Sequence, residues 1–319
     1  MEPHSPSGRE KYQLVLAMAH RQPAIVTAVV HPCDETSLSG AVEAHRLGLI
    51  SAILVAPEAR LRALAKQHAI DISGLQVVAS DHSHDSAARA VALVRAGKAE
   101  ALMKGSLHTD ELMEAVVARD TGLRTGRRIS HCYIMDVPGH AAPLIITDAA
   151  VNIAPTLAEK VDIVQNAIDL AHAIGLDRPL VAILSATETV NPALPSTVEA
   201  AALCKMADRG QITGGILDGP LALDNAISPE AAAIKHIVSP VAGKANVLVV
   251  PDLEAGNMLA KSLSFLADAE SAGIVLGARV PIILTSRADS VVTRLASCAV
   301  AVLVVARRRR LLAEAVAGV

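Results

Sequence analysis

The chain has 319 residues, of which 52% are hydrophobic and 1% aromatic, and its formal net charge is −3. This length exceeds one ordinary hydrophobic core, so we expect two domains. A slightly acidic chain with almost no aromatic side chains lacks both the basic field and the stacking platforms of nucleic-acid-binding proteins, which excludes that class.

Strand-like and helix-like segments alternate through the first part of the chain. The strand-like segments are short runs of small and branched aliphatic residues, and short connections join them to the helices. We expect strands at 24–30, 52–55, 76–79 and 99–103, and helices at 39–47, 58–68, 85–96 and 109–119. This alternation predicts a parallel, doubly wound α/β sheet.

The pattern changes near residues 133–143, where Pro138, Gly139, His140 and Pro143 interrupt it. We place a domain crossing there. Beyond it we expect strands at 144–147, 180–184, 215–217, 245–250 and 281–284, and helices at 156–174, 196–208, 256–266 and 291–316. The last helix is apolar all round at 299–306, which suits a buried or subunit-interface position.

The cysteines predict buried thiols in a reducing cytoplasm. They are far apart in the sequence, so the spacings of zinc and redox motifs are absent. They are Cys33, Cys132, Cys204 and Cys298. Residues 1–10 are polar, so we expect no signal peptide. The longest apolar run, 298–306, is shorter than the ~20 residues of a membrane helix, so we expect no membrane association.

The strongest candidate site follows the strand at 281–284. The apolar run ends at Thr285 and is followed by Ser286, Arg287 and Asp289. A guanidinium fits phosphate oxygens, a hydroxyl can donate to an oxyanion, and a carboxylate can accept a proton. The alternative is a helix cap with a surface ion pair, which a bare Ser-Arg-x-Asp string favours. The preceding strand brings the ligand site level with it, because open α/β sheets bind ligands beyond the carboxyl ends of their strands, so both interpretations stay open.

A second candidate is the turn Lys104-Gly105-Ser106 between a strand and a helix start. A turn with a lysine at a helix N-terminus is suited to phosphate, although the glycine order of a Walker A loop is missing. Asp110 and Glu111 in the first helical turn would oppose an anion there, and they also complement the helix dipole.

Weaker candidates lie elsewhere. A basic loop carrying Arg124, Arg127, Arg128, Ser130 and His131 could bind phosphate or a nucleotide tail, although a solvated loop is the commoner explanation. Asp252 and Asn257 flank a helix start after the strand at 245–250. Cys33 lies between His31 and Asp34, but sequence neighbours rarely converge on one point, so we do not expect it to be a nucleophile.

Four long stretches resemble the phosphate acetyltransferase/phosphate butyryltransferase family. They are KGSLHT at 104–109, DGPLALDNAISPEAA at 218–232, SPVAGKANVLVVPDLEAGN at 239–257 and LTSRADS at 284–290. The resemblance implies a two-domain α/β fold like that of the isocitrate and isopropylmalate dehydrogenases, with the active site in the interdomain cleft. It implies a discontinuous first domain, 1–136 plus 285–319, a second domain, 137–284, and a homodimer.

The implied reaction converts acyl-CoA and phosphate into acyl phosphate and CoA through a ternary complex. Ser286 and Arg287 then bind substrate and stabilise the transition state, with Asp289 as the catalytic base. Asp289 follows Arg287 by two residues, as in butyryl-type motifs, so acetyl and butyryl transfer both stay open, with acetyl preferred. An ordinary aspartate has a pKa of about 3.9 and is a poor base near pH 7, so burial must raise the pKa of Asp289. The charge of Arg287 opposes that rise.

The remaining expected substrate-binding residues come from the other candidate segments. They are Lys104, Gly105, Ser106, Arg128, Ser130, Asp252 and Asn257. The mechanism needs no metal, and coenzyme A enters as a substrate, not as a cofactor. A dehydrogenase on the related fold would need a cluster of metal-binding carboxylates, which the sequence does not show. A CoA-binding module without turnover is the non-enzyme alternative.

Overall fold

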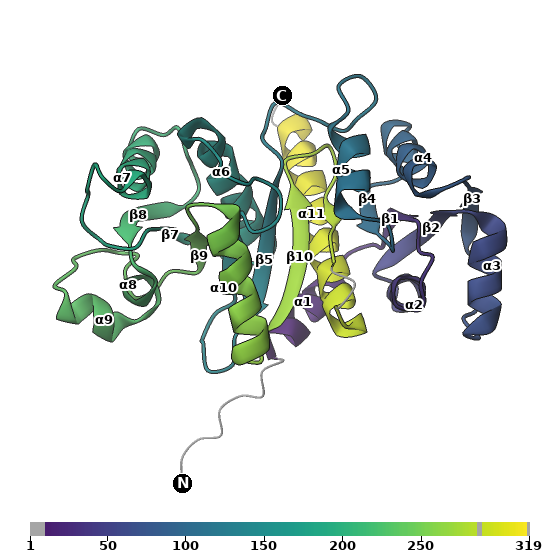
Figure 1. Cartoon of the computed structure of the whole chain (residues 1–319), viewed down its shortest axis with the longest axis horizontal. Helices are drawn as coiled ribbons and strands as arrows, with labels where there is room; N and C mark the ends of the chain where they lie inside the picture. Colours follow the sequence, from purple (N-terminus) through teal and green to yellow (C-terminus); the bar gives the residue numbers. More distant parts are fainter. Residues whose placement is uncertain (1–9, 286–288, 318–319) are drawn as a thin grey trace, which may run out of the picture. The chain divides into compact units, whose positions relative to one another are not determined.

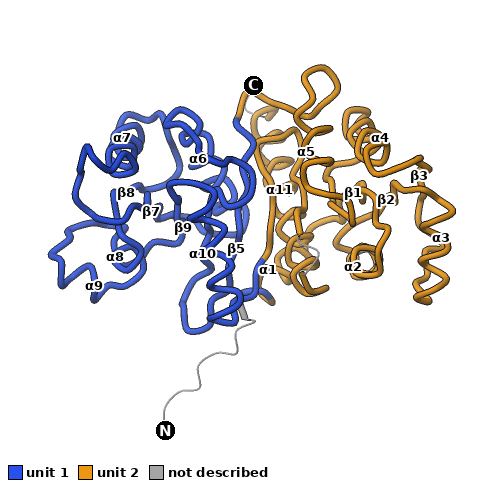
Figure 2. The backbone as a smooth tube through the Cα atoms, in the orientation of Figure 1, with its two compact units in different colours: residues 1–12, 128–271 blue, residues 13–127, 272–319 orange. Residues whose placement is uncertain are grey.

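A computed structural model describes residues 10–285 and 289–317, and the chain divides into two compact units (Figure 2). Unit 1 comprises Met1–Tyr12 and Arg128–Ser271, and unit 2 comprises Gln13–Arg127 and Ala272–Val319. Each unit contains a mostly parallel sheet with helices on both faces, which confirms the predicted α/β class. The domain limits predicted after residues 136 and 284 stay a prediction.

In unit 2 the strand order is β3-β2-β1-β4-β11-β10. All neighbours are parallel except β10, which is antiparallel to β11. The bounds are β1 (Ile25–Val30), β2 (Ile50–Ala56), β3 (Gln76–Ala79), β4 (Ala101–Lys104), β10 (Glu270–Leu276) and β11 (Ile282–Ile283). β4 is buried along its whole length and β1 along nearly all of it, which explains their unbroken aliphatic sequence.

Helices cover both faces of this sheet (Figure 1). α4 (Ser83–Arg95) and α5 (Thr109–Val117) pack together on one face, and α2 (Glu35–Arg46) packs against α11 (Val291–Ala317) on the other. α3 (Glu58–Gln67) follows β2. Residues 298–305 of α11 are buried within the chain.

In unit 1 the strand order is β5-β6-β9-β7-β8, and only the β5–β6 pair is antiparallel. The bounds are β5 (Ser130–Asp136), β6 (Leu144–Thr147), β7 (Leu180–Leu184), β8 (Ile216–Leu221) and β9 (Val247–Val249). The helices are α6 (Leu157–Ala173) and α7 (Pro195–Asp208) on one face, with α8 (Leu223–Ile227), α9 (Pro229–Ile234) and α10 (Leu253–Leu266) on the other.

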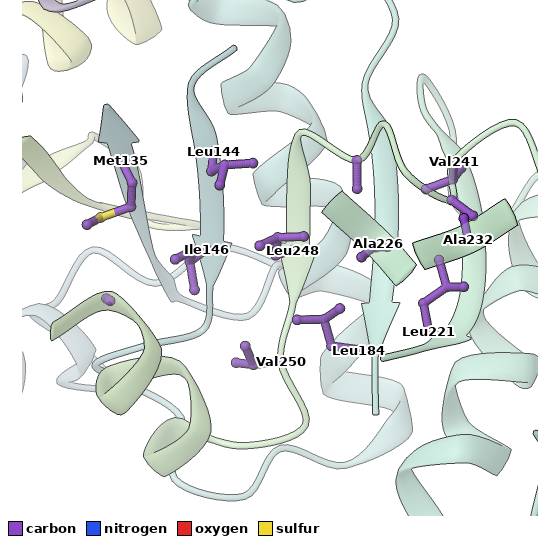
Figure 3. Close-up of a cluster of buried hydrophobic side chains, with 14 of the residues drawn as sticks. Met135, Leu144, Ile146, Leu184, Leu221, Ala226, Ala232, Val241, Leu248 and Val250 are labelled. Atoms are coloured by element: carbon purple, nitrogen blue, oxygen red, sulfur yellow. The ribbon is translucent and has the colours of Figure 1, made fainter. Parts of the chain in front are cut away.

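The core of unit 1 beneath α8, α9 and α10 is aliphatic. Met135, Leu144, Leu248 and Leu221 come from four different strands and belong to one buried cluster (Figure 3). The short helices α8 and α9 contribute small side chains to the same cluster, such as Ala226 and Ala232. This packing follows from a composition rich in small aliphatics and poor in aromatic residues.

Every strand and helix that the sequence pattern predicts is present, with ends shifted by a few residues. The helix expected from residue 39 begins at Glu35, because the Asp34 side chain accepts a hydrogen bond from the Ser37 N–H and caps it. Five elements were missed, namely α1 (Glu10–Ala19), β5, α8, α9 and β10.

The expectation that Ser130 and His131 lie in a basic loop is wrong. Both belong to β5 and are fully buried, because this strand lies inside the unit despite its polar residues. Among residues 10–285 and 289–317, no helix has the combined length and apolar character needed to cross a membrane.

Candidate active site

The carboxyl ends of β1, β4 and β11 form the best candidate site in unit 2. The register pairs Val30 of β1 with Lys104 of β4, and Ile283 of β11 with Met103 of β4. The three parallel strands therefore end at one edge of the sheet. β2 lies on one side of β1 and β4 on the other, so the connections that follow β1 and β4 diverge here, as at the ligand sites of open α/β sheets.

The loops after β1 and β4 are fastened to each other. The Ser106 hydroxyl donates to the His31 carbonyl oxygen at 2.8 Å and accepts from the Cys33 N–H at 3.2 Å. The Gly105 N–H donates to the Val30 carbonyl oxygen at 2.8 Å. A Cβ at position 105 would lie 2.4 Å from that oxygen, so only glycine fits this close approach.

A cavity of about 390 Å³ opens beside these loops. Its lining consists of polar and charged side chains with one leucine. It is lined by His31, Cys33, Asp34, Arg60, Ser83, Ser106, Leu107, His108 and Glu111. All of these residues belong to unit 2. Their position beyond the strand ends is the one expected for a bound substrate.

Hydrogen bonds fix the carboxylates of this cavity. Glu111 accepts from the Ser83 hydroxyl at 2.7 Å and from the His108 N–H at 2.7 Å. The hydrogen bond from Ser83 is the main reason that the pKa of Glu111 is lowered. Glu111 therefore stays ionised at neutral pH and holds the start of α5 in place.

Burial favours the neutral forms of two further lining groups, His31 and Cys33. Burial lowers the pKa of His31, whose Nδ1 lies 3.0 Å from the Ser86 hydroxyl oxygen. Burial also raises the pKa of the Cys33 thiol. A thiol that stays protonated is a poor nucleophile, in line with the expectation that Cys33 is not catalytic.

Lys104 ends β4 and is only 4% exposed. Its Nζ lies 3.4 Å from the Gly105 carbonyl oxygen. A buried ammonium group at a strand end is costly unless it is compensated. Because β4 pairs with β11 in parallel, Lys104, Gly105 and Ser106 lie at the same edge of the sheet as the end of β11.

The structure describes the residues that flank the predicted Ser-Arg pair after β11, namely Thr285 and Asp289. Ser286 and Arg287 lie outside the described residues. Thr285 is buried and accepts a hydrogen bond from Arg294 Nη1 at 2.7 Å, and Asp289 is partly buried. Arg294 is attracted by the charges of Asp289 and Asp34, although burial lowers its pKa.

The predicted residues of unit 1 have hydrogen-bond partners within that unit. Asp252 caps α10 by accepting from the Ala255 N–H at 2.9 Å, and the Asn257 amide donates to the Ala149 carbonyl oxygen at 3.2 Å. The Ser130 hydroxyl accepts from the Asn166 amide at 2.8 Å. These contacts are structural.

Arg128 is the most accessible of the predicted unit 1 residues, with its side chain 49% exposed. Its Nε donates to Asn152 Oδ1 at 2.7 Å, and its Nη1 lies 2.9 Å from Glu159 Oε1. The Asn152 amide in turn donates to the buried Asp148 carboxylate. Burial raises the pKa of Asp148, which three backbone N–H groups oppose by hydrogen bonding to it.

Sequence reasoning missed Arg60 and Arg294. Arg60 lies in α3, which the pattern predicted without any reason to assign it a ligand. Arg294 had a signal, because it is the only charged residue between Val291 and Ala306. Within the part of the chain that the structure describes, no group of three or more metal-binding side chains is found.

Comparison with known proteins gives consistent matches. The family model described as phosphate acetyl/butaryl transferase matches residues 79–302. A phosphate acetyltransferase of Rhizobium meliloti is 66% identical over 304 residues, 95% of this chain and 96% of the relative. A phosphate butyryltransferase of Clostridium acetobutylicum is 42% identical over 277 residues, 87% of this chain and 92% of the relative.

Solved structures agree with these sequence matches. The crystal structure of a branched-chain phosphotransacylase from Enterococcus faecalis aligns with a TM-score of 0.77 at 31% sequence identity. The alignment covers 88% of this chain and 99% of the solved chain. The overall chain path of both units is therefore that of a known acyl-transferring protein.

Proposed function

The chain belongs to the phosphate acetyl/butaryl transferase family, and we propose that it transfers an acetyl group between coenzyme A and inorganic phosphate. The family resemblance and the acyltransferase activity predicted from the sequence are confirmed by these matches. The observation that carries the acetyl assignment is the 66% identity to a phosphate acetyltransferase across 95% of the chain.

The proposed chemistry uses the edge formed by β1, β4 and β11. The thiol of coenzyme A, with a pKa of about 8.5, gives its proton to the Asp289 carboxylate. The sulfur attacks the carbonyl carbon of acetyl phosphate, a C–S bond forms, and the C–O bond to phosphate breaks with its electron pair leaving on phosphate. In the opposite direction a phosphate oxygen attacks the thioester carbonyl carbon and the thiolate leaves.

Charge stabilisation falls to the groups around that carbonyl. Ser286 donates to the developing oxyanion and Arg287 holds the phosphate in this proposal. Lys104 at the end of β4 supplies a second positive charge, and the backbone of Gly105 and Ser106 orders the loop. The register that brings Lys104 and Thr285 to the same sheet edge supports this grouping.

The unit 1 residues have a secondary place in this proposal. Arg128, Ser130, Asp252 and Asn257 stay predicted substrate contacts, and Arg128 is favoured because its guanidinium is half exposed. The location of the active site in a cleft between two domains also stays a prediction from the resemblance. Coenzyme A is a substrate here, and the proposed reaction uses no further cofactor.

The direct experiment is a thiol-release assay with inorganic phosphate and acetyl-, propionyl- and butyryl-CoA. We expect the highest kcat/KM with acetyl-CoA and phosphate-dependent release of free thiol. Butyryl transfer is the second candidate, favoured by the two-residue spacing between Arg287 and Asp289 and by the 42% identical butyryltransferase. A preference for butyryl-CoA would select it, and binding of CoA without thiol release would refute both.

We also propose a cytoplasmic homodimer. Large apolar side chains are exposed along α10, with Met258 62%, Phe265 77% and Leu266 85% exposed, and Ile153 is 76% exposed. A surface of this kind is typical of subunit contacts. Light scattering after gel filtration tests the assembly, and a monomer at micromolar concentration would refute it.

A further inference from the structure

Arg294 is an unusual residue for its place in the fold. It lies in the first turn of α11, is 2% exposed, and is the only charge in the run from Val291 to Ala306. Burying a guanidinium costs several kcal/mol unless hydrogen bonds and opposite charges compensate it. The groups that compensate it therefore indicate what it does.

The guanidinium reaches the end of β11. Arg294 Nη1 donates to the hydroxyl oxygen of Thr285 at 2.7 Å, and Thr285 is itself buried. Thr285 is the last described residue before the Ser-Arg pair, and it lies two residues beyond β11, the strand beside β4. Arg294 therefore fastens the point at which the chain leaves the sheet.

Two carboxylates attract the same guanidinium. They belong to Asp289, which lies just before α11, and to Asp34, which caps α2. Cys298, one turn further along α11, is a third titrating neighbour, and burial raises the pKa of its thiol to about 12, so it is neutral. The guanidinium is thus hydrogen-bonded at the end of β11 and attracted by a carboxylate at the start of α2 and by one just before its own helix.

The neighbouring helix makes room for this side chain. A Cβ at Gly40 of α2 would lie 2.7 Å from Arg294 Cδ. The backbone of Gly40 does not have a positive φ, so its conformation does not require glycine. The glycine is explained by the space that the arginine stem needs between α2 and α11.

Direct contact between Arg294 and substrate does not fit an exposure of 2%. Resting on the proposed function, we propose that Arg294 is a positioning residue for acyl transfer, which orients the Asp289 carboxylate by charge attraction from a guanidinium that is fastened to the end of β11 by its hydrogen bond to Thr285. The alternative is a purely structural buried ion pair that ties α11 to the sheet.

The test compares Arg294→Met and Arg294→Lys with the unaltered protein in the thiol-release assay. We expect R294M to lose roughly 100-fold in kcat, the cost of a catalytic group misplaced by about 1 Å, with KM for acetyl-CoA changed by less than about threefold. R294K keeps the charge but lacks the planar fork, so we expect an intermediate kcat. Millimolar guanidinium chloride should restore part of the activity of R294M and should not raise the activity of the unaltered protein.

A double-mutant cycle with Asp289→Asn separates positioning from structure. If Arg294 acts through Asp289, R294M lowers kcat much less in the D289N background than alone. Equal losses in both backgrounds would overturn the proposal, as would an R294M variant with normal kcat. Arg309→Met, on the same helix and paired with Glu100, is the matched control and should keep its kcat.

Thermal melts establish that each variant is folded. If R294M does not fold, R294K carries the test, and a normal kcat in R294K without a response to guanidinium would overturn the proposal. The unaltered protein is assayed first. Failure of the proposed function then appears as absent turnover in that protein, whereas failure of this inference appears as unaffected variants in an active background.

Discussion

The carboxyl edge of unit 2 and the loops around α10 in unit 1 contain similar polar residues but engage them differently. In unit 2, Arg60, Ser106 and His108 line a cavity of about 390 Å³. In unit 1, Asp252 and Asn257 are hydrogen-bonded to the backbone that they stabilise. A polar residue after a strand is therefore a candidate for chemistry only when its loop leaves space beside it.

Both units bury ionisable side chains, with different partners. Unit 2 buries the cations Lys104 and Arg294 next to the strand ends. Unit 1 buries His131 as a neutral imidazole, whose pKa burial lowers to about 3. Unit 1 also buries Lys160, but there the ammonium group is paired with Glu199.

The largest expected effect comes from Asp289→Asn, which tests unit 2 as the catalytic side of the comparison. Removing the proposed base should lower kcat by about 10³-fold, with a smaller change in KM, because general-base catalysis contributes ~10²–10⁴-fold. Steady-state kinetics with acetyl-CoA and phosphate measures this. Asp120→Asn, an exposed aspartate of the same unit, is the control, and a normal kcat in D289N would show that another group accepts the proton.

The next effect concerns the acid stability of unit 1. The pKa of His131 is about 3 in the folded protein and about 6.5 in the unfolded chain, so the unfolded state takes up a proton between these values. The contribution of neutral His131 to the free energy of unfolding is therefore complete above pH 6.5 and is lost as the pH falls toward 3. His131→Leu should abolish this loss, giving a relative gain of about 2 kcal/mol at pH 5.

Urea unfolding of His131→Leu at pH 7.5 and pH 5 checks this expectation. At pH 7.5 the substitution should be neutral or stabilising, because neither ring nitrogen has a hydrogen-bond partner among the residues described. His20→Gln, at an exposed histidine, serves as the control. If H131L loses as much unfolding free energy between pH 7.5 and pH 5 as the unaltered protein does, His131 is not responsible for the acid dependence.

The sequence predicted the repeated strand–helix pattern because parallel strands buried on both faces are continuous aliphatic runs, as in β1 and β4. It could not predict β5, where buried Ser130 and His131 look like loop residues. Their burial depends on long-range packing and on partners such as Asn166, which lies 36 residues away. Such contacts leave no local periodicity.

The candidate site was predictable in part. Lys104–Ser106 and Thr285–Asp289 were singled out because each follows a strand, and the β4–β11 pairing brings these strand ends together. Arg294 was not singled out, because its role depends on the side chain crossing from α11 to Thr285 and on the space at Gly40. The roles of Ser286 and Arg287, outside the described residues, stay predictions.

Ser106→Ala tests whether the fastening of the two unit 2 loops matters for activity. The variant loses the hydroxyl that donates to the His31 carbonyl oxygen and accepts from the Cys33 N–H. The Cys33 N–H and the His31 carbonyl oxygen keep their backbone partners, so the variant loses two hydrogen bonds of ~0.5–1.5 kcal/mol each without leaving a buried group unsatisfied. Because the loosened turn no longer holds Lys104 in place, we expect kcat/KM to fall by about tenfold. Ser51→Ala, at an exposed strand position, is the control, and equal activity of the two variants would remove Ser106 from the site.

The smallest effect is expected for Asp252→Ala, which tests the structural side of the comparison directly. Loss of the cap of α10 should cost about 1 kcal/mol of stability, measured as a lower urea midpoint. Asp252→Ser keeps an oxygen that can accept from the Ala255 N–H but removes the charge, so it should recover most of that stability. If the carboxylate also contacts substrate, KM rises in both variants, since both lack it. If capping is the whole role, the serine variant restores stability and KM together, and the contrast between the two units holds at this residue.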